Sequence, residues 1–376
     1  MSQTVMALRD ALTALKNVTA EQARTMPPAY YTSPEFLALE EEHIFRKEWV
    51  CVGHTGEIPN PGDFFTTELV GEQLIVLRAE DGAVRVLSNV CRHRGNMLVE
   101  GRGNRKNFIC TYHAWVYNSA GELLNAPLMD RVPGFDKSAC TLPTVALEIW
   151  RGFIYVNLDG QAAPLASKLT QLEPIIENYR MQDRNFVYGE DTVWDCNWKC
   201  LAENFMEGYH LSPTHNKTLH PITPTALCVK MPHDDYHTGY YAKYHPSYPE
   251  RLPYPPGLTR EETRQSPMFA INPNHVVGLA TNACVYMCLR PLGPDQVGIR
   301  WGVISTAAPD DKSATDYVKL CHEFNAEDRE KLETLQKGLK TRYLPSNYLA
   351  PADFEGTIWD MYQFMAARLG SDVALS

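Results

Sequence analysis

Two short segments of the chain each pair a cysteine with a histidine. They are Cys91-Arg-His93 and Cys110-Thr-Tyr-His113, with sixteen residues between them. Each segment offers one thiolate and one imidazole, so two such loops can enclose a metal centre between them. The fold must bring these two loops together, and this requirement limits the possible folds of the chain more than any other feature of the sequence.

The mixture of ligand types in each segment favours an iron–sulfur cluster over a zinc ion. Two thiolates on one iron and two imidazoles on the other form the ligation of a Rieske [2Fe–2S] cluster. A structural zinc site is one alternative, but such sites usually take both cysteines from one element and both histidines from another. Chance is a second alternative, because the chain has ten cysteines and twelve histidines.

The residues around these two loops, from 49 to 165, predict a small all-β domain. Gly, Asn and Asp turns such as Glu80-Asp81-Gly82 separate short runs with β-type side chains. The clearest runs are Gln73–Leu77, Val84–Leu87 and Phe153–Val156.

Two further histidines, His210 and His215, lie at the end of a predicted helix over residues 197–209. Glu207 is three residues before His210, a spacing that would place both side chains on one helix face. Pro213 is expected to end this helix, and the following turn can bring His215 back toward His210. With one carboxylate, two histidines form the facial triad of non-haem Fe(II) oxygenases, which leaves positions open for O₂.

The sequence offers Asp328 as that carboxylate. It falls on the apolar stripe of a predicted helix over residues 314–340, which contains Phe324, Leu332, Leu335 and Leu339. A buried carboxylate is costly unless something pairs with it, and either a metal or a salt bridge would do so. Glu327 and Glu330 lie off this stripe and are predicted to be solvated. The rival Asp360 falls off the apolar face of the last predicted helix.

The remaining patterns predict an α+β protein. Further helices are expected over residues 1–17, 33–49 and 354–369. Two runs with alternating apolar side chains, Ala283–Leu289 and Val297–Val303, predict a β-hairpin. The Pro- and Tyr-rich stretch 245–268 predicts a loop. We therefore expect N-terminal helices over 1–48, the all-β domain over 49–165 and a mixed region of helices and strands over 166–376.

Composition and charge restrict the function. A chain of 376 residues is long enough for two cores. Its net charge of −10 argues against nucleic acid as a partner.

No apolar run in the sequence is long enough to span a membrane. Arg9 and Asp10 interrupt the N-terminal apolar segment, so we expect no signal peptide and a cytoplasmic protein. Its cysteines are then expected to be thiols or metal ligands.

Taken together, these motifs resemble the alpha subunits of Rieske non-haem iron oxygenases. The loops Cys91-Arg-His-Arg-Gly95 and Cys110-Thr-Tyr-His-Ala-Trp115 are similar to the two Rieske loops, although Thr111 and Ala114 replace the commoner Pro and Gly. The resemblance covers nearly the whole chain. It also includes Phe36, Ile44-Phe45, Trp49, Asn197-Trp-Lys199, the Glu207 to His215 segment and Glu327-Asp328.

The resemblance implies specific roles for these residues. It implies a helix-grip catalytic domain, formed by the N-terminal helices over 1–48 and by residues 166–376, into which the all-β domain is inserted. This domain has an antiparallel sheet and C-terminal helices, and in it His210, His215 and Asp328 bind a mononuclear Fe(II). Many family members have Asp at the position of Glu207, where it bridges the iron site to a Rieske histidine of the neighbouring subunit. Glu at this position resembles the members that oxidise carnitine, choline and betaine-type substrates. The family geometry also implies a homotrimer or stacked trimers.

The sequence contains no convincing nucleotide-binding motif. Gly101-Arg-Gly103 lacks the third glycine and the following helix of a dinucleotide site. NAD(P)H and flavin are therefore expected in a separate reductase, with or without a ferredoxin. Arg92 and Arg94 flank the cluster ligands and form part of its docking face, or are merely solvated.

The sequence leaves the small-molecule substrate open. The region after His215 is rich in aromatic residues that would form a cage for a quaternary ammonium group, stack on an aromatic acid or belong to the core. These residues are Tyr236, Tyr240, Tyr241, Tyr244, Tyr248, Phe269 and Tyr286. Quaternary-amine monooxygenation and aromatic ring hydroxylation both remain open. Two other classes are a Rieske electron carrier without an oxygenase site and a zinc-stabilised binding protein.

Overall fold

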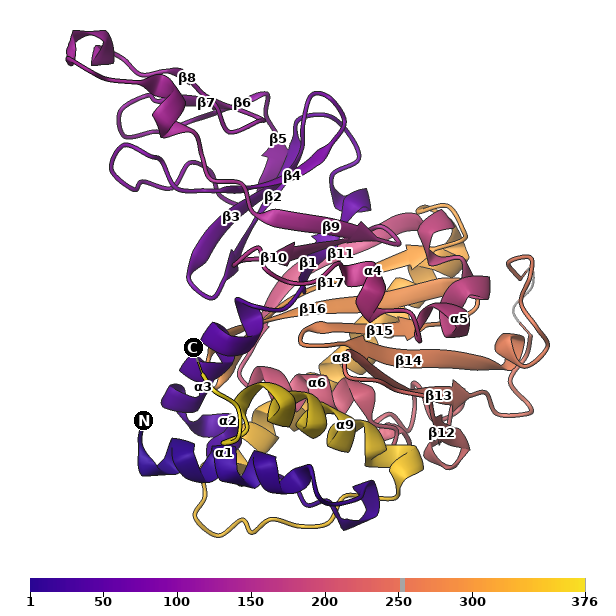
Figure 1. The fold of residues 1–376 in the computed structure, drawn as a ribbon. Helices are drawn as coiled ribbons and strands as arrows, with labels where there is room; N and C mark the ends of the chain where they lie inside the picture. The colour runs from indigo at the N-terminus through magenta and orange to yellow at the C-terminus, as the bar shows by residue number, and fades with distance from the viewer. Residues whose placement is uncertain (251–253, 376) are drawn as a thin grey trace. The chain divides into compact units, whose positions relative to one another are not determined.

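The structure is a computed structural model that describes residues 1–250 and 254–375 (Figure 1). The chain divides into two compact units, Met1–Val50 with Ala163–Ser376, and Cys51–Ala162. In the described residues, no helix is both long enough and apolar enough to cross a membrane.

The unit Cys51–Ala162 is built from short antiparallel strands in three small sheets. One sheet has the order β4-β3-β2-β5, a second has β6-β7-β8, and a third has β1-β10-β9. The strands are β1 (Val50–His54), β2 (Asp63–Leu69), β3 (Glu72–Arg78), β4 (Val84–Ser88), β5 (Arg102–Asn104), β6 (Asn107–Ile109), β7 (Val116–Asn118), β8 (Leu123–Asn125), β9 (Ala146–Trp150) and β10 (Phe153–Asn157). The three predicted strands correspond to β3, β4 and β10.

The core of this unit surrounds the predicted cluster loops. Cys91 and Cys110 are buried in one hydrophobic cluster with Phe64, Ile75 and Trp115. The sheets therefore hold both thiol groups in an apolar interior, while the histidines of the same loops reach its edge.

The larger unit contains a seven-stranded antiparallel sheet with the order β11-β17-β16-β15-β14-β13-β12. Its strands are β11 (Asn185–Trp194), β12 (Cys228–Lys230), β13 (His237–Lys243), β14 (Gln265–Ile271), β15 (His275–Leu279), β16 (Ala283–Gly293) and β17 (Gln296–Ser305). Strands β16 and β17 form the predicted hairpin. The predicted loop over 245–268 is wrong at its end, because β14 begins at Gln265; residues 251–253 lie outside the described residues.

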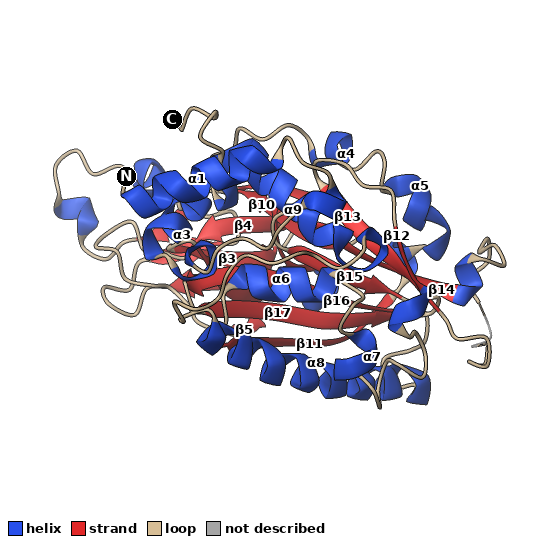
Figure 2. Ribbon diagram, turned by 90° about the horizontal axis from the view of Figure 1, so that it is seen from below, coloured by secondary structure: helices blue, strands red, loops and turns tan. Residues whose placement is uncertain are grey.

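Three helices of this unit, α6, α8 and α9, pack against the sheet, and Figure 2 shows them on one side of it, while α1 packs against α9. The helices are α1 (Gln3–Leu15), α2 (Ala29–Thr32), α3 (Pro34–Glu40), α4 (Leu165–Lys168), α5 (Glu173–Ile176), α6 (Trp198–Met206), α7 (Leu211–Thr214), α8 (Lys312–Gly338) and α9 (Ala352–Leu369). An antiparallel sheet with helices on its face, joined to an all-β unit, confirms the predicted α+β fold.

The predicted helix over 197–209 is wrong at its C-terminal end, and the difference shapes the site. Helix α6 ends at Met206, and Glu207 has an extended backbone conformation. A second short helix, α7, begins after His210 and contains Pro213. Glu207 and His210 therefore do not share a helix face, and Pro213 does not end the first helix. The predicted helix over 33–49 is also shorter: α3 continues only as one π-helical turn to Phe45.

Candidate metal centres

The two predicted cluster loops have the same local construction. The first follows β4, and the second joins β6 to β7. In the first, the Gly95 amide donates to the Cys91 carbonyl at 3.0 Å, and in the second, the Ala114 amide donates to the Cys110 carbonyl at 2.9 Å. These matched turns bring the two histidines together, with 3.1 Å between the Nδ1 atoms of His93 and His113.

Both turns require a left-handed backbone conformation at equivalent positions. Gly95 has a φ of 78° and Ala114 has a φ of 56°. A residue with a β-carbon pays about 1–2 kcal/mol for this conformation. This cost explains why glycine is the commoner residue at the position of Ala114. Ala114 still forms the same turn hydrogen bond as Gly95 and is not itself a ligand.

The side chains around the loops suit buried thiolate ligands. The Tyr117 hydroxyl lies 3.4 Å from the Cys91 sulfur and accepts a hydrogen bond from the Arg92 amide at 3.0 Å. Burial raises the pKa of Cys91, so a positive partner such as iron would be needed to hold its thiolate at neutral pH. The His93 ring stacks on Trp115, with 4.8 Å between ring centroids.

The arrangement of these four ligands fits a two-iron cluster better than a single zinc ion. Among the described residues, the metal-ligand side chains that gather around one point are His210, His215 and Asp328, and not three of these four. A tetrahedral zinc site needs all four atoms around one point. Two thiols and two imidazoles spread over two metals match the donor set of a Rieske cluster.

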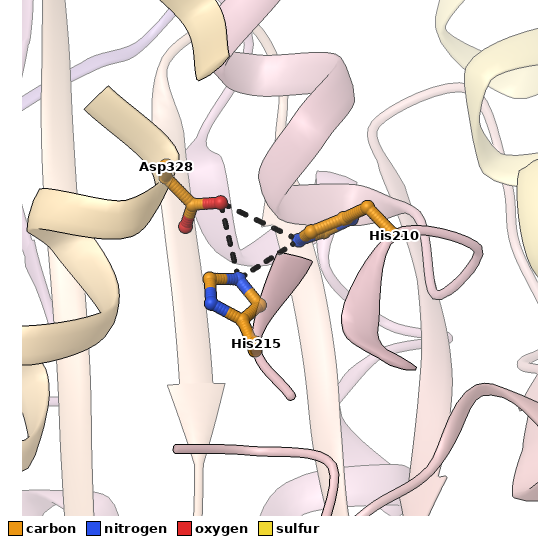
Figure 3. Close-up of side chains that lie close together, drawn as sticks. All are labelled: His210, His215 and Asp328. Carbon is orange, nitrogen blue, oxygen red and sulfur yellow. Dashed lines mark hydrogen bonds and ion pairs between the residues drawn. The ribbon is translucent and has the colours of Figure 1, made fainter. Parts of the chain in front are cut away.

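The second predicted centre brings His210, His215 and Asp328 together (Figure 3). The Nε2 atoms of the two histidines lie 3.2 Å apart, and Asp328 Oδ1 lies 3.1 Å from His215 Nε2 and 3.6 Å from His210 Nε2. Asp328 is 7% exposed, and its Oδ1 atom has no hydrogen-bond partner among the described residues. A buried carboxylate oxygen facing two imidazole nitrogens fits a divalent metal, and this donor set suits Fe(II).

A second carboxylate orients each of these histidines. Glu207 Oε1 lies 2.6 Å from His210 Nδ1, and Glu327 Oε2 lies 2.7 Å from His215 Nδ1. Each carboxylate can accept a hydrogen bond from the protonated Nδ1 atom, which leaves Nε2 free to bind a metal. The prediction that Glu327 is solvated is only partly right: its side chain is 29% exposed, but its carboxylate contacts the His215 ring. Glu330 is exposed, as predicted.

Replacement of Glu327 by glutamine is expected to weaken iron binding by about 10–100-fold, because His215 loses its charged partner. The measurement is an iron titration of the apo protein with detection of bound metal. Glu330→Gln is the matched control, since Glu330 lies on the same helix, is exposed and forms an ion pair with Lys331. Equal iron affinity in both variants would contradict the orienting role.

The rival carboxylate, Asp360, is occupied elsewhere. It is buried on α9, where the Lys230 ammonium lies 2.8 Å from Oδ1 and the Thr238 hydroxyl donates to Oδ2 at 2.6 Å. The expectation that Asp360 lies off the buried face is therefore wrong, because a lysine crosses to it from β12. This pairing keeps Asp360 out of the set formed by the two histidines.

A cavity opens beside the two histidines and Asp328. Of the aromatic residues singled out in the sequence, three line it: Tyr240, Tyr244 and Tyr248. Tyr236, Tyr241, Phe269 and Tyr286 lie outside its lining. Phe205, Tyr317 and Phe324 also line the cavity. The sequence pattern did not indicate Tyr317, although it lies three helical turns before Asp328 on α8.

Two family models match the chain. Residues 48–136 match the Rieske [2Fe–2S] domain, and residues 181–371 match the catalytic domain of the ring hydroxylating alpha subunit. The first contains all four cluster candidates, and the second contains Glu207 and the three mononuclear-site candidates.

Individual proteins with these domains are also similar. The carnitine monooxygenase oxygenase subunit of Acinetobacter baumannii is 36% identical over 201 residues, or 51% of this chain and 53% of that protein. The large oxygenase component of a naphthalene 1,2-dioxygenase system from Pseudomonas aeruginosa is 35% identical over 213 residues, or 54% and 47%. The chain thus matches about half the length of these curated relatives.

A solved quaternary ammonium Rieske monooxygenase, studied for carnitine oxidation by gut microbiota and inter-subunit electron transfer, has the same fold. Its TM-score is 0.82 at 24% identity, covering 94% of this chain and 96% of that one. At this identity, the likeness shows the fold alone.

Because the catalytic-domain model matches just over half of the 376 residues and a Rieske domain precedes it, the chain belongs to the ring-hydroxylating oxygenase alpha subunits.

Proposed function

We propose that this chain is the terminal oxygenase component of a multicomponent Rieske oxygenase that uses O₂ to hydroxylate or demethylate a small organic substrate. The observation that supports this best is the buried group of His210, His215 and Asp328 at the side of an aromatic cavity. The match to a catalytic domain argues against a simple Rieske electron carrier. The spread of the cluster ligands argues against a zinc protein.

In this proposal, Cys91, Cys110, His93 and His113 hold the [2Fe–2S] cluster, and the histidine pair with Asp328 holds Fe(II). The mononuclear iron, when bound, supplies the activation of O₂ for oxidation of a substrate C–H bond. The protein contributes the rest: two carboxylates fix the imidazoles, and apolar and aromatic side chains exclude water from the reacting centre.

We assign a quaternary amine as the substrate class ahead of an aromatic acid. Carnitine and glycine betaine monooxygenase subunits are among the similar proteins. Tyr240, Tyr244 and Tyr248 line the cavity, and such rings attract a trimethylammonium group through their π-faces. The naphthalene dioxygenase relative keeps aromatic ring hydroxylation as the second candidate.

Incubation of the reconstituted enzyme with a surrogate reductase and NADH is expected to consume O₂ in step with oxidation of a trimethylammonium compound. The product is formaldehyde if an N-methyl carbon is hydroxylated, and trimethylamine if the chain carbon on nitrogen is hydroxylated. The panel should contain choline, glycine betaine, carnitine and benzoate. Hydroxylated benzoate without formaldehyde would instead favour the aromatic class. Oxygen consumption that gives only peroxide with every compound would contradict both.

Electrons are proposed to come from a separate NAD(P)H-dependent flavin reductase, with or without a ferredoxin, in the cytoplasm. Arg92 and Arg94 are exposed beside the cluster loops and suit an acidic partner. We further propose a homotrimer or stacked trimers in which Glu207 connects His210 to the Rieske histidine of the neighbouring subunit. A monomer that turns over substrate would refute this route.

Glu207→Gln is expected to stop most turnover while leaving a reducible cluster. Because Glu207 also orients His210, its replacement must be compared with replacement of a carboxylate that orients a histidine but is not proposed to carry electrons. Glu327→Gln is that control, because Glu327 holds the other histidine in the same way. Both variants are studied after loading to equal iron content. In a single turnover of pre-reduced enzyme, Rieske oxidation should be slow in Glu207→Gln and near normal in Glu327→Gln. Equal rates would remove Glu207 from the electron path.

A further inference from the structure

A surface hollow lies in the smaller unit, apart from the two metal centres. One segment forms it, residues 124–138, which begins in β8 and which we call the β8 arm (Figure 1). The residues that line the hollow all belong to this arm: Asn125, Ala126, Pro127, Leu128, Asp130, Phe135, Asp136, Lys137 and Ser138. The arm therefore folds back on itself and encloses the hollow with its own side chains.

The apolar side chains of the β8 arm divide into two groups. Three pack against the hydrophobic core that contains both cluster cysteines: Ala126, Met129 and Phe135. Three others are exposed to solvent: Leu124 at 45%, Leu128 at 64% and Val132 at 46%. A single exposed apolar side chain is common on a protein surface, but several on one short arm suit contact with another protein.

Leu128 has a backbone conformation that leucine rarely adopts. Its φ is 65°, in the left-handed region, and its side chain is the most exposed of the three. A β-carbon at this φ destabilises the fold relative to glycine. Burial within the chain offsets little of this strain, because the side chain lines the hollow and is mostly exposed. A leucine here is better explained by a contact outside the chain.

The inner wall of the hollow is close to a cluster ligand. Phe135 lines the hollow, and its ring centroid lies 5.8 Å from that of Trp115. The Trp115 ring in turn stacks on His93, with 4.8 Å between centroids and 10° between the ring planes. Trp115 is buried, so this stack is shielded from water. A molecule seated in the hollow is therefore two ring contacts away from His93.

The second cluster histidine leads to a different part of the surface. The His113 ring lies 3.8 Å from the Tyr112 ring, and Tyr112 is exposed and lies outside the lining of the hollow. The electron route proposed through Glu207 needs a cluster histidine against the neighbouring subunit. Tyr112 and His113 suit that contact. The hollow then remains as a second approach to the cluster, for the protein that supplies electrons.

The lining of the hollow suits a transient partner. Besides its apolar side chains it contains Asp130, Asp136 and Lys137. Contacts between redox partners are small and mix polar with apolar groups, whereas permanent subunit contacts are larger and more hydrophobic. A donor that must leave after each electron needs the first kind of contact, so a donor fits this hollow better than a second copy of the chain does.

We propose that the hollow of the β8 arm is the docking site of the electron donor, a protein that carries a reduced flavin or iron–sulfur centre. Leu128 forms an apolar contact with this donor, and one electron passes across Phe135 and Trp115 to the cluster at His93. The donor centre loses one electron, the cluster changes from [2Fe–2S]²⁺ to [2Fe–2S]⁺, and no bond forms or breaks. This inference rests on the proposed function, because it needs a cluster that a separate protein reduces.

The first test measures Kd for a surrogate reductase that contains flavin and a [2Fe–2S] centre and that reduces the wild-type cluster. Leu128→Gly removes the side chain and retains the left-handed turn. With both proteins oxidised, calorimetry should show a Kd raised by about tenfold or more, the effect of losing one buried leucine. The melting temperature should stay equal or rise, because glycine relieves the strain. An unchanged Kd, or loss of the cluster from the variant, overturns the inference.

A pair of charged variants controls for general effects of substitution. Leu128→Glu is expected to raise Kd at least as much as Leu128→Gly, because it places a charge in the apolar contact. Ile149→Glu is the matched control, since Ile149 is 49% exposed on β9 of the same unit but lies outside the hollow. Its Kd should equal that of the wild type. Equal increases in both variants would show charge repulsion without a specific contact and would overturn the inference.

The second test follows reduction of the cluster by its absorbance. At low reductase concentration, reduction should slow in Leu128→Gly about as much as affinity falls, whereas dithionite should reduce the variant and the wild type equally fast. Light scattering should give the same oligomeric state for both proteins. A changed oligomeric state would assign the hollow to a second copy of the chain and overturn the inference.

A single turnover separates this inference from the proposed function. The cluster is reduced with dithionite, the reductant is removed, and O₂ and a trimethylammonium compound are added. Leu128→Gly should then give as much product as the wild type, and a lower yield would place the arm in a later step and overturn the inference. If the wild type gives no product with any compound of the panel while Leu128 still controls affinity for the reductase, substrate oxidation is wrong and the docking site stands.

Discussion

The Asp328→Ala protein is expected to lose its mononuclear iron and all measurable turnover while retaining the Rieske absorption spectrum. Asp328 supplies the carboxylate that faces His210 and His215, and in the described part of the chain its buried Oδ1 atom has no hydrogen-bond partner. Residues that merely orient metal ligands change affinity by about 10–100-fold, so loss of a ligand should exceed this range. The measurement is iron and sulfide analysis of the purified protein together with O₂ uptake.

Asp360→Asn provides the control for this variant. Asp360 is equally buried, but it pairs with Lys230 and Thr238 on another part of the sheet. Its replacement should lower stability and leave the iron content per folded protein unchanged. Full iron occupancy in Asp328→Ala would show that a different carboxylate completes the site.

The Cys91→Ala protein is expected to lose the Fe–S spectrum and all reductase-driven turnover, but to keep the mononuclear iron. Cys91 is buried between the sheets of the smaller unit, and its loop is held by the turn that ends at Gly95. No water-exposed group can replace a thiolate in that interior. The mononuclear-site candidates all belong to the other compact unit, so their iron should remain.

Cys140→Ala is the matched control, because Cys140 packs against the same core without belonging to either loop. It should retain the Rieske electron paramagnetic resonance signal at full intensity. A Cys91→Ala protein that also retains this signal would refute the cluster assignment.

The sequence alone determined the features that depend on neighbours along the chain. The Cys91 and Cys110 loops were recognisable because each ligand pair lies within three residues and their turns are formed locally. Helix α8 and the β16–β17 hairpin were predictable because periodic apolar side chains reflect burial of one face. The same periodicity placed Asp328 among buried residues, which suggested it as a ligand.

Only the tertiary structure decided which distant groups meet. Glu327 contacts His215 across 112 residues of sequence, and helical periodicity could assign it only to a polar face. Helix α6 ends at Met206, and Glu207 then contacts His210. This turn is held by the Glu207 carboxylate, which accepts hydrogen bonds from the backbone amides of Tyr209 and His210. Propensity describes local backbone preferences, whereas these contacts are fixed by packing between elements that are far apart in the chain.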